Sequence, residues 1–196
     1  RDPRYQFDGI VAAFRSAAAH MPRVDAIGVS SAGVFIGNSP MVSSLFLSVP
    51  EAFREDVKTI YDRAAREIGE NVPIVVANDG DVTALAGSLS LGEGAVMGVA
   101  MGTSEAAGYV TPEGHVLGWF NELAFAPVDL NEQAARDEWS GDIGVGCKYF
   151  SQEAVAKLAP AAGIAPDERG NAETLKRVQK LAAQGDPGAL AIFRTI

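Results

Sequence analysis

The stretch Val75–Gly87, VVANDGDVTALAG, constrains the fold of this chain more than any other. Residues 73–77 form a short apolar run that is typical of a buried strand, and it ends abruptly at Asn78 and Asp79. An apolar helical pattern follows at once. A strand that leads directly into a helix is the basic unit of α/β folds, in which ligands bind beyond the carboxyl ends of the strands. The sequence therefore predicts an α/β fold with polar side chains at a strand end.

The rest of the chain alternates helix and strand signals in its first half and then changes character near Leu91. Ser48 is a candidate N-cap for a long helix that we expect to end at Gly69. The predicted helices span 7–21, 48–69, 81–92, 151–163 and 171–184, with another from 186, and the predicted strands span 24–34, 72–79, 95–102 and 106–119. This order favours α/β packing with some parallel strand pairing, and a boundary between residues 1–90 and 91–196.

Composition excludes several classes of partner. Hydrophobic residues make up 47% of the 196 residues, which is enough for a sizeable core. The net charge is −9, from 16 basic and 25 acidic residues, whereas nucleic acids and membrane surfaces bind basic faces. Cys147 is the one cysteine, so no internal disulfide can form. With no apolar run of membrane-spanning length and no leader pattern, we expect a cytoplasmic protein that binds neither nucleic acid nor membrane.

The acids at the strand end have two interpretations. Asp79 could be a general base or a metal ligand, because it stands where a strand meets a helix N-terminus. Alternatively, Asn78–Gly80 is a simple turn and Asp81 is the N-cap of the helix that follows. Asp81 suits the cap better, since it immediately precedes the helical pattern. That leaves Asp79 without an evident structural role.

A second stretch, VAMGTSEAAGYV, interrupts two predicted strands with Gly102, Thr103 and Ser104. Small residues at such a turn let backbone N–H groups approach a phosphate, and the two hydroxyls add donors. The alternative is an ordinary hairpin loop of small residues. Glu105 fits the phosphate interpretation only if it faces away or a cation intervenes, because a carboxylate repels phosphate.

A serine hydrolase is a remote alternative. Residues 28–32, GVSSA, resemble a nucleophile elbow with Ser30 at a strand end. Such an enzyme needs a histidine base, and the chain offers His20, upstream of the strand, and His115, in a predicted turn.

These stretches, taken in order, resemble the ROK family of sugar kinases within the actin-like and hexokinase-like ATPases. The resemblance rests on AIGVSSAGV, PIVVANDGDVTALAG, VAMGTSEAAGYVTPEGHVLGWFNELAF, GVGCKYFSQEAVAKLA and GDPGALAIFRTI, and it is most specific over 73–125. It implies an actin-like ATPase (ribonuclease H-like) fold of two α/β lobes around a cleft with mixed sheets. Residues 1–90 would belong to the N-terminal lobe and residues 91–196 to the C-terminal lobe.

The resemblance also implies an activity, the transfer of the γ-phosphoryl group of ATP to a sugar hydroxyl. Asp79 would be the general base, Asn78 and Glu122 would bind the sugar, and Gly102, Thr103 and Ser104 would bind phosphate. ATP with Mg²⁺ would be the cofactor, since phosphoryl transfer depends mostly on positioning and charge neutralisation. The expected partners are a small-molecule sugar and ATP, in a homo-oligomer, a dimer.

The chain departs from the family pattern at several positions. Phe125 stands where the family has a histidine, and Cys147 stands alone where it has a zinc-binding cysteine cluster, so we expect no structural zinc. Lys148 and Tyr149 occupy the place of a later glutamate. We find no match for the first phosphate loop or the C-terminal adenosine segment. We therefore expect a fragment without kinase turnover of its own, or, as the alternative, a non-catalytic sugar-binding or sensing relative.

Overall fold

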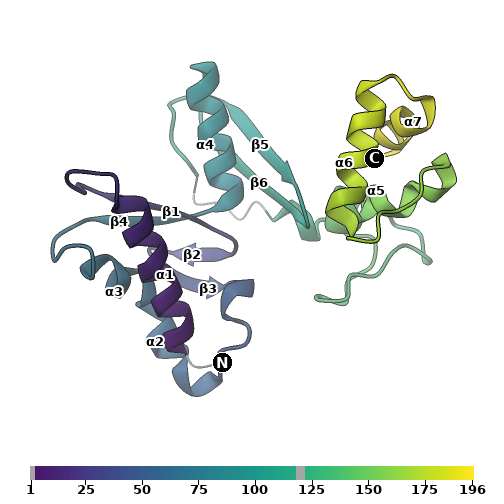
Figure 1. The fold of residues 1–196 in the computed structure, drawn as a ribbon. Helices are drawn as coiled ribbons and strands as arrows, with labels where there is room; N and C mark the ends of the chain where they lie inside the picture. The colour runs from purple at the N-terminus through teal and green to yellow at the C-terminus, as the bar shows by residue number, and fades with distance from the viewer. Residues whose placement is uncertain (1–2, 118–121) are drawn as a thin grey trace. The chain divides into compact units, whose positions relative to one another are not determined.

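A computed structural model describes residues 3–117 and 122–196 of the chain (Figure 1). The last part of the predicted strand 106–119 lies outside these residues. The α-helices are α1 Pro3–Ala18, α2 Arg54–Lys58, α3 Ile60–Arg66, α4 Asp79–Leu91, α5 Gln152–Leu158, α6 Asn171–Ala183 and α7 Pro187–Thr195. The strands are β1 Ile27–Ser31, β2 Val34–Ile36, β3 Ser39–Val42, β4 Ile74–Asn78, β5 Val96–Met101 and β6 Glu105–Val110. Single 3₁₀ turns cover Ser44–Phe46, Glu51–Phe53, Leu123–Phe125, Gly146–Lys148 and Pro160–Ala162.

The chain divides into two compact units. Unit 1 comprises Arg1–Val96 and Val110–Phe120, and unit 2 comprises Met97–Tyr109 and Asn121–Ile196. Each unit has its own hydrophobic cluster. The lobe boundary between residues 90 and 91 remains a prediction.

Unit 1 is organised by the parallel pairing of β1 with β4. The pairing is in register from Ile27 opposite Ile74 to Ser31 opposite Asn78. Because the two strands run in the same direction, their carboxyl ends meet at one edge. This is the parallel pairing that the alternation of elements predicts, and it brings the β1–β2 turn beside the start of α4.

The core of unit 1 forms where helices pack on these strands. Ile60 and Tyr61 of α3 are 1% and 2% exposed, and Val76 of β4 is 5% exposed. Phe7, Ile10 and Phe14 of α1 pack against this cluster. Their spacing in the sequence predicts a helix with one apolar face, and the structure confirms it.

The prediction of one long helix over 48–69 is wrong. The chain there forms a 3₁₀ turn whose N-cap residue is Pro50, then α2, then α3. The break lies at Thr59, whose backbone (φ −109°, ψ 9°) leaves the helical region. Arg63 donates to the carbonyl of Asp56, 3.4 Å away, and so satisfies one acceptor beside the break. The helix ends at Arg66, before Gly69.

The hairpin that β2 and β3 form was not predicted from the sequence. Val34 pairs with Val42 and Ile36 with Ser39, with an irregularity after Val34. Each strand is only three or four residues long, and Pro40 lies within β3. Short segments that contain proline give a weak periodic signal, so tertiary contacts define this hairpin.

Unit 2 contains the strands β5 and β6 and a cluster of three helices. The connection between the strands has three residues, which allows only antiparallel pairing. Val155 of α5, Val178 of α6 and Ile192 of α7 meet in one cluster, and Figure 1 shows the three helices gathered near the C-terminus. Each of these helices overlaps a predicted one. None of the helices within the described ranges is long and apolar enough to cross a membrane.

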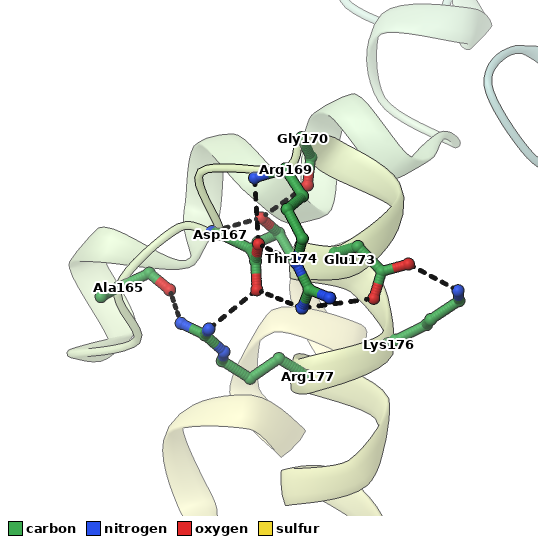
Figure 2. Close-up of polar contacts among 8 residues, drawn as sticks. All are labelled: Ala165, Asp167, Arg169, Gly170, Glu173, Thr174, Lys176 and Arg177. Carbon is green, nitrogen blue, oxygen red and sulfur yellow. Dashed lines mark hydrogen bonds and ion pairs between the residues drawn. The ribbon is translucent and has the colours of Figure 1, made fainter.

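A polar clamp holds the loop before α6 (Figure 2). The Asp167 carboxylate accepts from Nε of Arg169 and from Nη2 of Arg177, both at 2.9 Å. The Asp167 N–H donates to Oγ1 of Thr174 at 2.8 Å, and Thr174 is 1% exposed. The hydrogen bond from Arg169 is the main cause that holds the pKa of Asp167 well below its usual value of 3.8. The clamp ties the loop to the first turns of α6.

Candidate functional site

The junction of β4 and α4 explains why an amide ends this strand. Asn78 is the N-cap of α4, and its Oδ1 accepts from the N–H of Gly80 at 2.8 Å. The prediction that Asp81 caps the helix is therefore wrong, since the helix begins two residues earlier, at Asp79. Asn78 has the extended backbone (φ −61°, ψ 145°) that an N-cap requires, and its side chain reaches the second residue of the helix.

The same side chain also holds the neighbouring turn. Nδ2 of Asn78 donates to the carbonyl of Gly33 at 2.8 Å. Gly33 has φ +129°, and a Cβ there would lie 2.8 Å from Cβ of Ser43, so only glycine fits. An asparagine amide has two N–H donors and an oxygen with two lone pairs. Asn78 therefore keeps one donor and one acceptor site for a ligand.

Asp79 is the first residue of α4 and is half-buried. Its carbonyl accepts from Oγ1 of Thr83 at 2.8 Å. Among residues 3–117 and 122–196, none hydrogen-bonds or ion-pairs with its carboxylate. A carboxylate so placed, beyond the end of a parallel strand pair, can accept a proton from a hydroxyl.

Ser30 does not occupy a nucleophile elbow. It lies inside β1, paired with Ala77, and the element that follows is the short strand β2 and not a helix. No hydrogen bond joins Ser30 to His20 or His115 in the described part of the chain. The geometry of an elbow, a sharp turn from strand to helix, is absent at this position.

In unit 2 the candidate phosphate loop is the β5–β6 turn. Gly102, Thr103 and Ser104 are exposed. The Gly102 N–H donates to the Ser104 carbonyl at 2.8 Å, and the Gly102 carbonyl accepts from the N–H of Gln152 at 2.9 Å. The N–H groups of Thr103 and Ser104 donate to no residue within the described ranges. Two free N–H groups and two hydroxyls at a turn can bind an anion.

Glu105 lies in the interior of unit 2, away from solvent. It is 8% exposed, and its Oε2 is buried without a hydrogen-bond partner in the described structure. Burial raises the pKa of its carboxyl. A Cβ on Gly146 would lie 2.5 Å from Oε2 of Glu105 and 2.5 Å from the carbonyl of Leu123. The sequence predicted that Glu105 would repel a phosphate unless it faced away, and in the structure its carboxyl is buried against Gly146.

Glu122 is the residue before the 3₁₀ turn Leu123–Phe125 and is half-buried. Its carbonyl accepts from the N–H of Phe125 at 3.1 Å. The Phe125 ring packs on Trp139, with ring centroids 5.3 Å apart. An aromatic contact therefore stands at the position where the resemblance leads one to expect a histidine.

Lys148 and Tyr149, which stand where the family has its later glutamate, form ion pairs and hydrogen bonds within the structure. The Lys148 side chain is 3% exposed, and its ammonium pairs with Glu138 at 2.7 Å and Glu153 at 2.9 Å. These partners outweigh burial and raise the pKa of Lys148. Burial, followed by the nearby charge of Asp137, raises the pKa of the Cys147 thiol to about 11. No group of three or more His, Cys, Asp or Glu side chains suited to a metal ion occurs within the described residues.

The fold of this chain is similar to that of several solved structures. Neither a protein-family model nor a curated protein matches the chain. Among solved structures, the ROK hexokinase of Thermus thermophilus is 21% identical, with a TM-score of 0.60 over 96% of this chain. The fold is that of the ROK family.

Two further ROK structures support the same fold. A glucokinase from Streptomyces griseus, solved with glucose and AMPPNP, is 22% identical with a TM-score of 0.64. A ROK transcriptional regulator, a homologue of the E. coli MLC protein, is 21% identical with a TM-score of 0.65. The predicted α/β actin-like ATPase fold is thus confirmed.

The chain spans less than two thirds of each of these relatives. It matches 61% of the T. thermophilus chain, 64% of the S. griseus chain and 48% of the regulator. Kinases and a regulator share the fold, so the activity has to be argued from the site residues.

Proposed function

We propose that this chain is part of an ATP-dependent sugar kinase of the ROK type, with Asp79 as the general base. The observation that carries the proposal is that the two polar residues at the β4–α4 junction differ in their partners. Asn78 caps the helix and holds the β1–β2 turn, while the Asp79 carboxylate has no partner among the described residues. A half-buried carboxylate at a strand end, without a structural role, is suited to accept a hydroxyl proton.

The other residues would supply binding. The remaining donor and acceptor of Asn78 would contact the sugar beside the reacting hydroxyl, and Glu122 would hold further hydroxyls. The free N–H groups of Thr103 and Ser104, with Gly102 allowing close approach, would bind phosphate of ATP. Mg²⁺ would arrive with the nucleotide and neutralise charge on the transferred group. A homo-oligomer in the cytoplasm remains part of the proposal.

The alternative is a sugar-binding or sensing protein that does not use ATP. The likeness to a ROK regulator concerns the fold alone and does not favour this alternative. The two functions differ in one property, because a sensor binds sugar without binding nucleotide. Isothermal titration of the complete protein with a hexose panel and with ATP–Mg²⁺ separates them. Heat from both ligands supports the kinase, and heat from sugar alone supports the sensor.

The test of the catalytic role is Asp79→Asn in the complete protein. Loss of a general base lowers turnover by about 10²–10⁴-fold. Sugar affinity should change much less, since the substitution keeps the size of the side chain. Asp81→Asn, two residues along the same helix, is the matched control and should retain turnover. If Asp79→Asn turns over at the wild-type rate while correctly folded, Asp79 is not the base.

A further inference from the structure

Glu105, the first residue of β6, directly follows the candidate phosphate turn and has a buried carboxyl. The residue is 8% exposed, and its Oε2 has no hydrogen-bond partner within the described ranges. A buried polar atom without a partner is costly, because it loses its hydration and gains no hydrogen bond in return. The position of such an atom beside a candidate site therefore needs a physical explanation.

The Oε2 atom of Glu105 faces the point where two 3₁₀ turns meet. Leu123 begins one of these turns and Gly146 begins the other, and the Gly146 N–H donates to the Ala126 carbonyl at 3.0 Å. The position that a Cβ on Gly146 would occupy lies 2.5 Å from Oε2 of Glu105 and 2.5 Å from the Leu123 carbonyl oxygen. Both oxygens therefore border one small space, which exists because residue 146 has no side chain.

Two oxygen atoms that border one space attract each other only when one of them carries a hydrogen. The Leu123 carbonyl accepts one hydrogen bond, from the Ala126 N–H at 3.0 Å, and a carbonyl oxygen has two lone pairs. An ionised carboxylate only accepts hydrogen bonds, whereas a neutral carboxylic acid has an O–H donor. Burial raises the pKa of Glu105, which favours the neutral form. In that form Glu105 can donate to the second lone pair of the Leu123 carbonyl.

Both cations on the described elements around Glu105, which are β5, β6, α5 and the two 3₁₀ turns, pair with other acids. The Lys148 ammonium lies 2.7 Å from Glu138 and 2.9 Å from Glu153, and the Lys157 ammonium lies 2.8 Å from Glu153. These pairs leave the two cations engaged elsewhere, so they do not favour ionisation of Glu105. The remaining titratable residues on or directly beside these elements are Glu122, Cys147, Tyr109 and Tyr149.

The side chain of Glu105 joins the two segments of unit 2 to which the proposed function assigns ligands. Its backbone continues directly from Thr103 and Ser104, whose N–H groups would bind phosphate. Its carboxyl ends beside the carbonyl of Leu123, and the preceding residue, Glu122, would bind the sugar. One buried contact therefore connects the phosphate turn with the sugar-binding segment inside a single compact unit.

We propose that Glu105 is a positioning residue, whose neutral carboxyl donates to the Leu123 carbonyl and holds the phosphate turn in a fixed relation to Glu122. This inference rests on the proposed kinase function. Phosphoryl transfer depends mostly on how exactly the two substrates are placed. Loss of the contact would leave each ligand its own binding residues but would loosen their relation. The effect should therefore appear in kcat and not in the affinity for the sugar alone.

The test compares two substitutions of similar size in the complete protein. Glu105→Gln keeps a hydrogen-bond donor without charge, whereas Glu105→Met keeps the length of the side chain without a donor. Turnover is measured with a hexose panel and ATP–Mg²⁺. Glu105→Gln should keep kcat within about threefold of wild type, and Glu105→Met should lower it roughly tenfold, the effect of one lost hydrogen bond. Neither variant should change the dissociation constant of the sugar, measured without nucleotide, by more than about threefold.

A control variant and three outcomes decide the kinetic test. Ile192→Val lowers the stability of unit 2 within the three-helix cluster and should leave kcat unchanged. If Glu105→Gln loses kcat as strongly as Glu105→Met, the charge is required and the inference is overturned, while the kinase proposal stands. The same holds if Glu105→Met turns over at the wild-type rate, or if Ile192→Val loses as much. If wild type phosphorylates no sugar, both proposals are overturned.

The pH dependence of stability tests the neutral carboxyl without any activity. Because the pKa of Glu105 is raised in the folded protein, its folded state binds more protons than the unfolded state between the two pKa values. The stability of wild type relative to Glu105→Gln should therefore fall as the pH rises from the usual value of 4.5 through the folded pKa. Urea unfolding of both proteins between about pH 4 and about pH 8 measures this difference. A difference that stays constant over this range would overturn the inference.

Discussion

Substitution of Asn78 tests whether one side chain holds two elements together. Asn78→Ala removes the cap bond to the Gly80 N–H and the bond to the Gly33 carbonyl, both 2.8 Å long. Asn78→Ser retains a good capping oxygen but lacks the amide donor that reaches Gly33. The two variants therefore separate the cap from the tether.

The expected loss follows from the two bonds. Loss of an N-cap costs about 1 kcal/mol, and loss of a hydrogen bond to a half-buried carbonyl costs about 1 kcal/mol more. Asn78→Ala should therefore lower the free energy of unfolding of unit 1 by about 2 kcal/mol, and Asn78→Ser by about 1 kcal/mol. The left-handed Gly33 turn should also become more mobile in both variants, since each loses the tether.

Amide hydrogen exchange is the suitable assay, because it measures opening of each element separately. We expect faster exchange in α4 and in the β1–β2 turn for Asn78→Ala, and mainly in the turn for Asn78→Ser. Asp186→Ala is the control for a cap alone, since Asp186 accepts from the Ala189 N–H at 2.8 Å at the start of α7. It should cost about 1 kcal/mol in α7 and nothing in α4. Equal losses for the two Asn78 variants would show that the cap contributes nothing and refute the reasoning.

Two further predictions concern unit 2. Gly144 has φ +73°, and a Cβ there would overlap the backbone carbonyl of Asp129, whereas Gly141 has φ +81° with nothing nearer than 4.0 Å. Gly141→Ala should therefore cost about 1 kcal/mol and Gly144→Ala about 3 kcal/mol in urea unfolding, and equal costs would contradict the structure. Because the folded pKa of Asp167 is below its usual value, its stabilisation is complete above about pH 5 and falls as the pH drops through the folded pKa. Asp167→Asn should be less stable than wild type near pH 7, and the gap in melting temperature should narrow on acidification; a gap that stays constant down to pH 2 would exclude this role.

The helices and strands with strong hydrophobic periodicity were predicted correctly from the sequence. Those that depend on tertiary contacts were not. Phe7, Ile10 and Phe14 repeat at helical spacing, and the run before Asn78 is a strand, so both elements were predicted correctly. The interruption at Thr59 has no local signal, because the residues on both sides continue one apolar face. The β2–β3 hairpin is defined by its contact with the β1–β2 turn, which a periodic pattern cannot encode.

The candidate site likewise contains features that a local sequence pattern indicates and features that depend on folding. Asn78 and Asp79 were chosen as candidates because a strand stops at a polar pair, and their roles stay a prediction. The cap was assigned to Asp81 from its position before the helical pattern, whereas Asn78 is the N-cap. Propensity alone cannot decide among Asn78, Asp79 and Asp81, since asparagine and aspartate cap equally well. Burial of Glu105 against Gly146 was not predictable either, because the two residues are brought together only by folding of unit 2.

The arrangement explains why an amide and an acid follow one another at this strand end. Helix α4 needs an acceptor at its N-cap, and the Gly33 carbonyl needs a donor; among the residues that cap well, asparagine supplies both from one side chain. An aspartate at position 78 would cap the helix but would have no N–H to donate to the Gly33 carbonyl, and it would place a second carboxylate beside Asp79. Asparagine therefore leaves Asp79 as the one carboxylate directly at the end of β4. It follows that changes at Asn78 should affect stability and sugar binding together, whereas Asp79→Asn should affect turnover with little effect on stability.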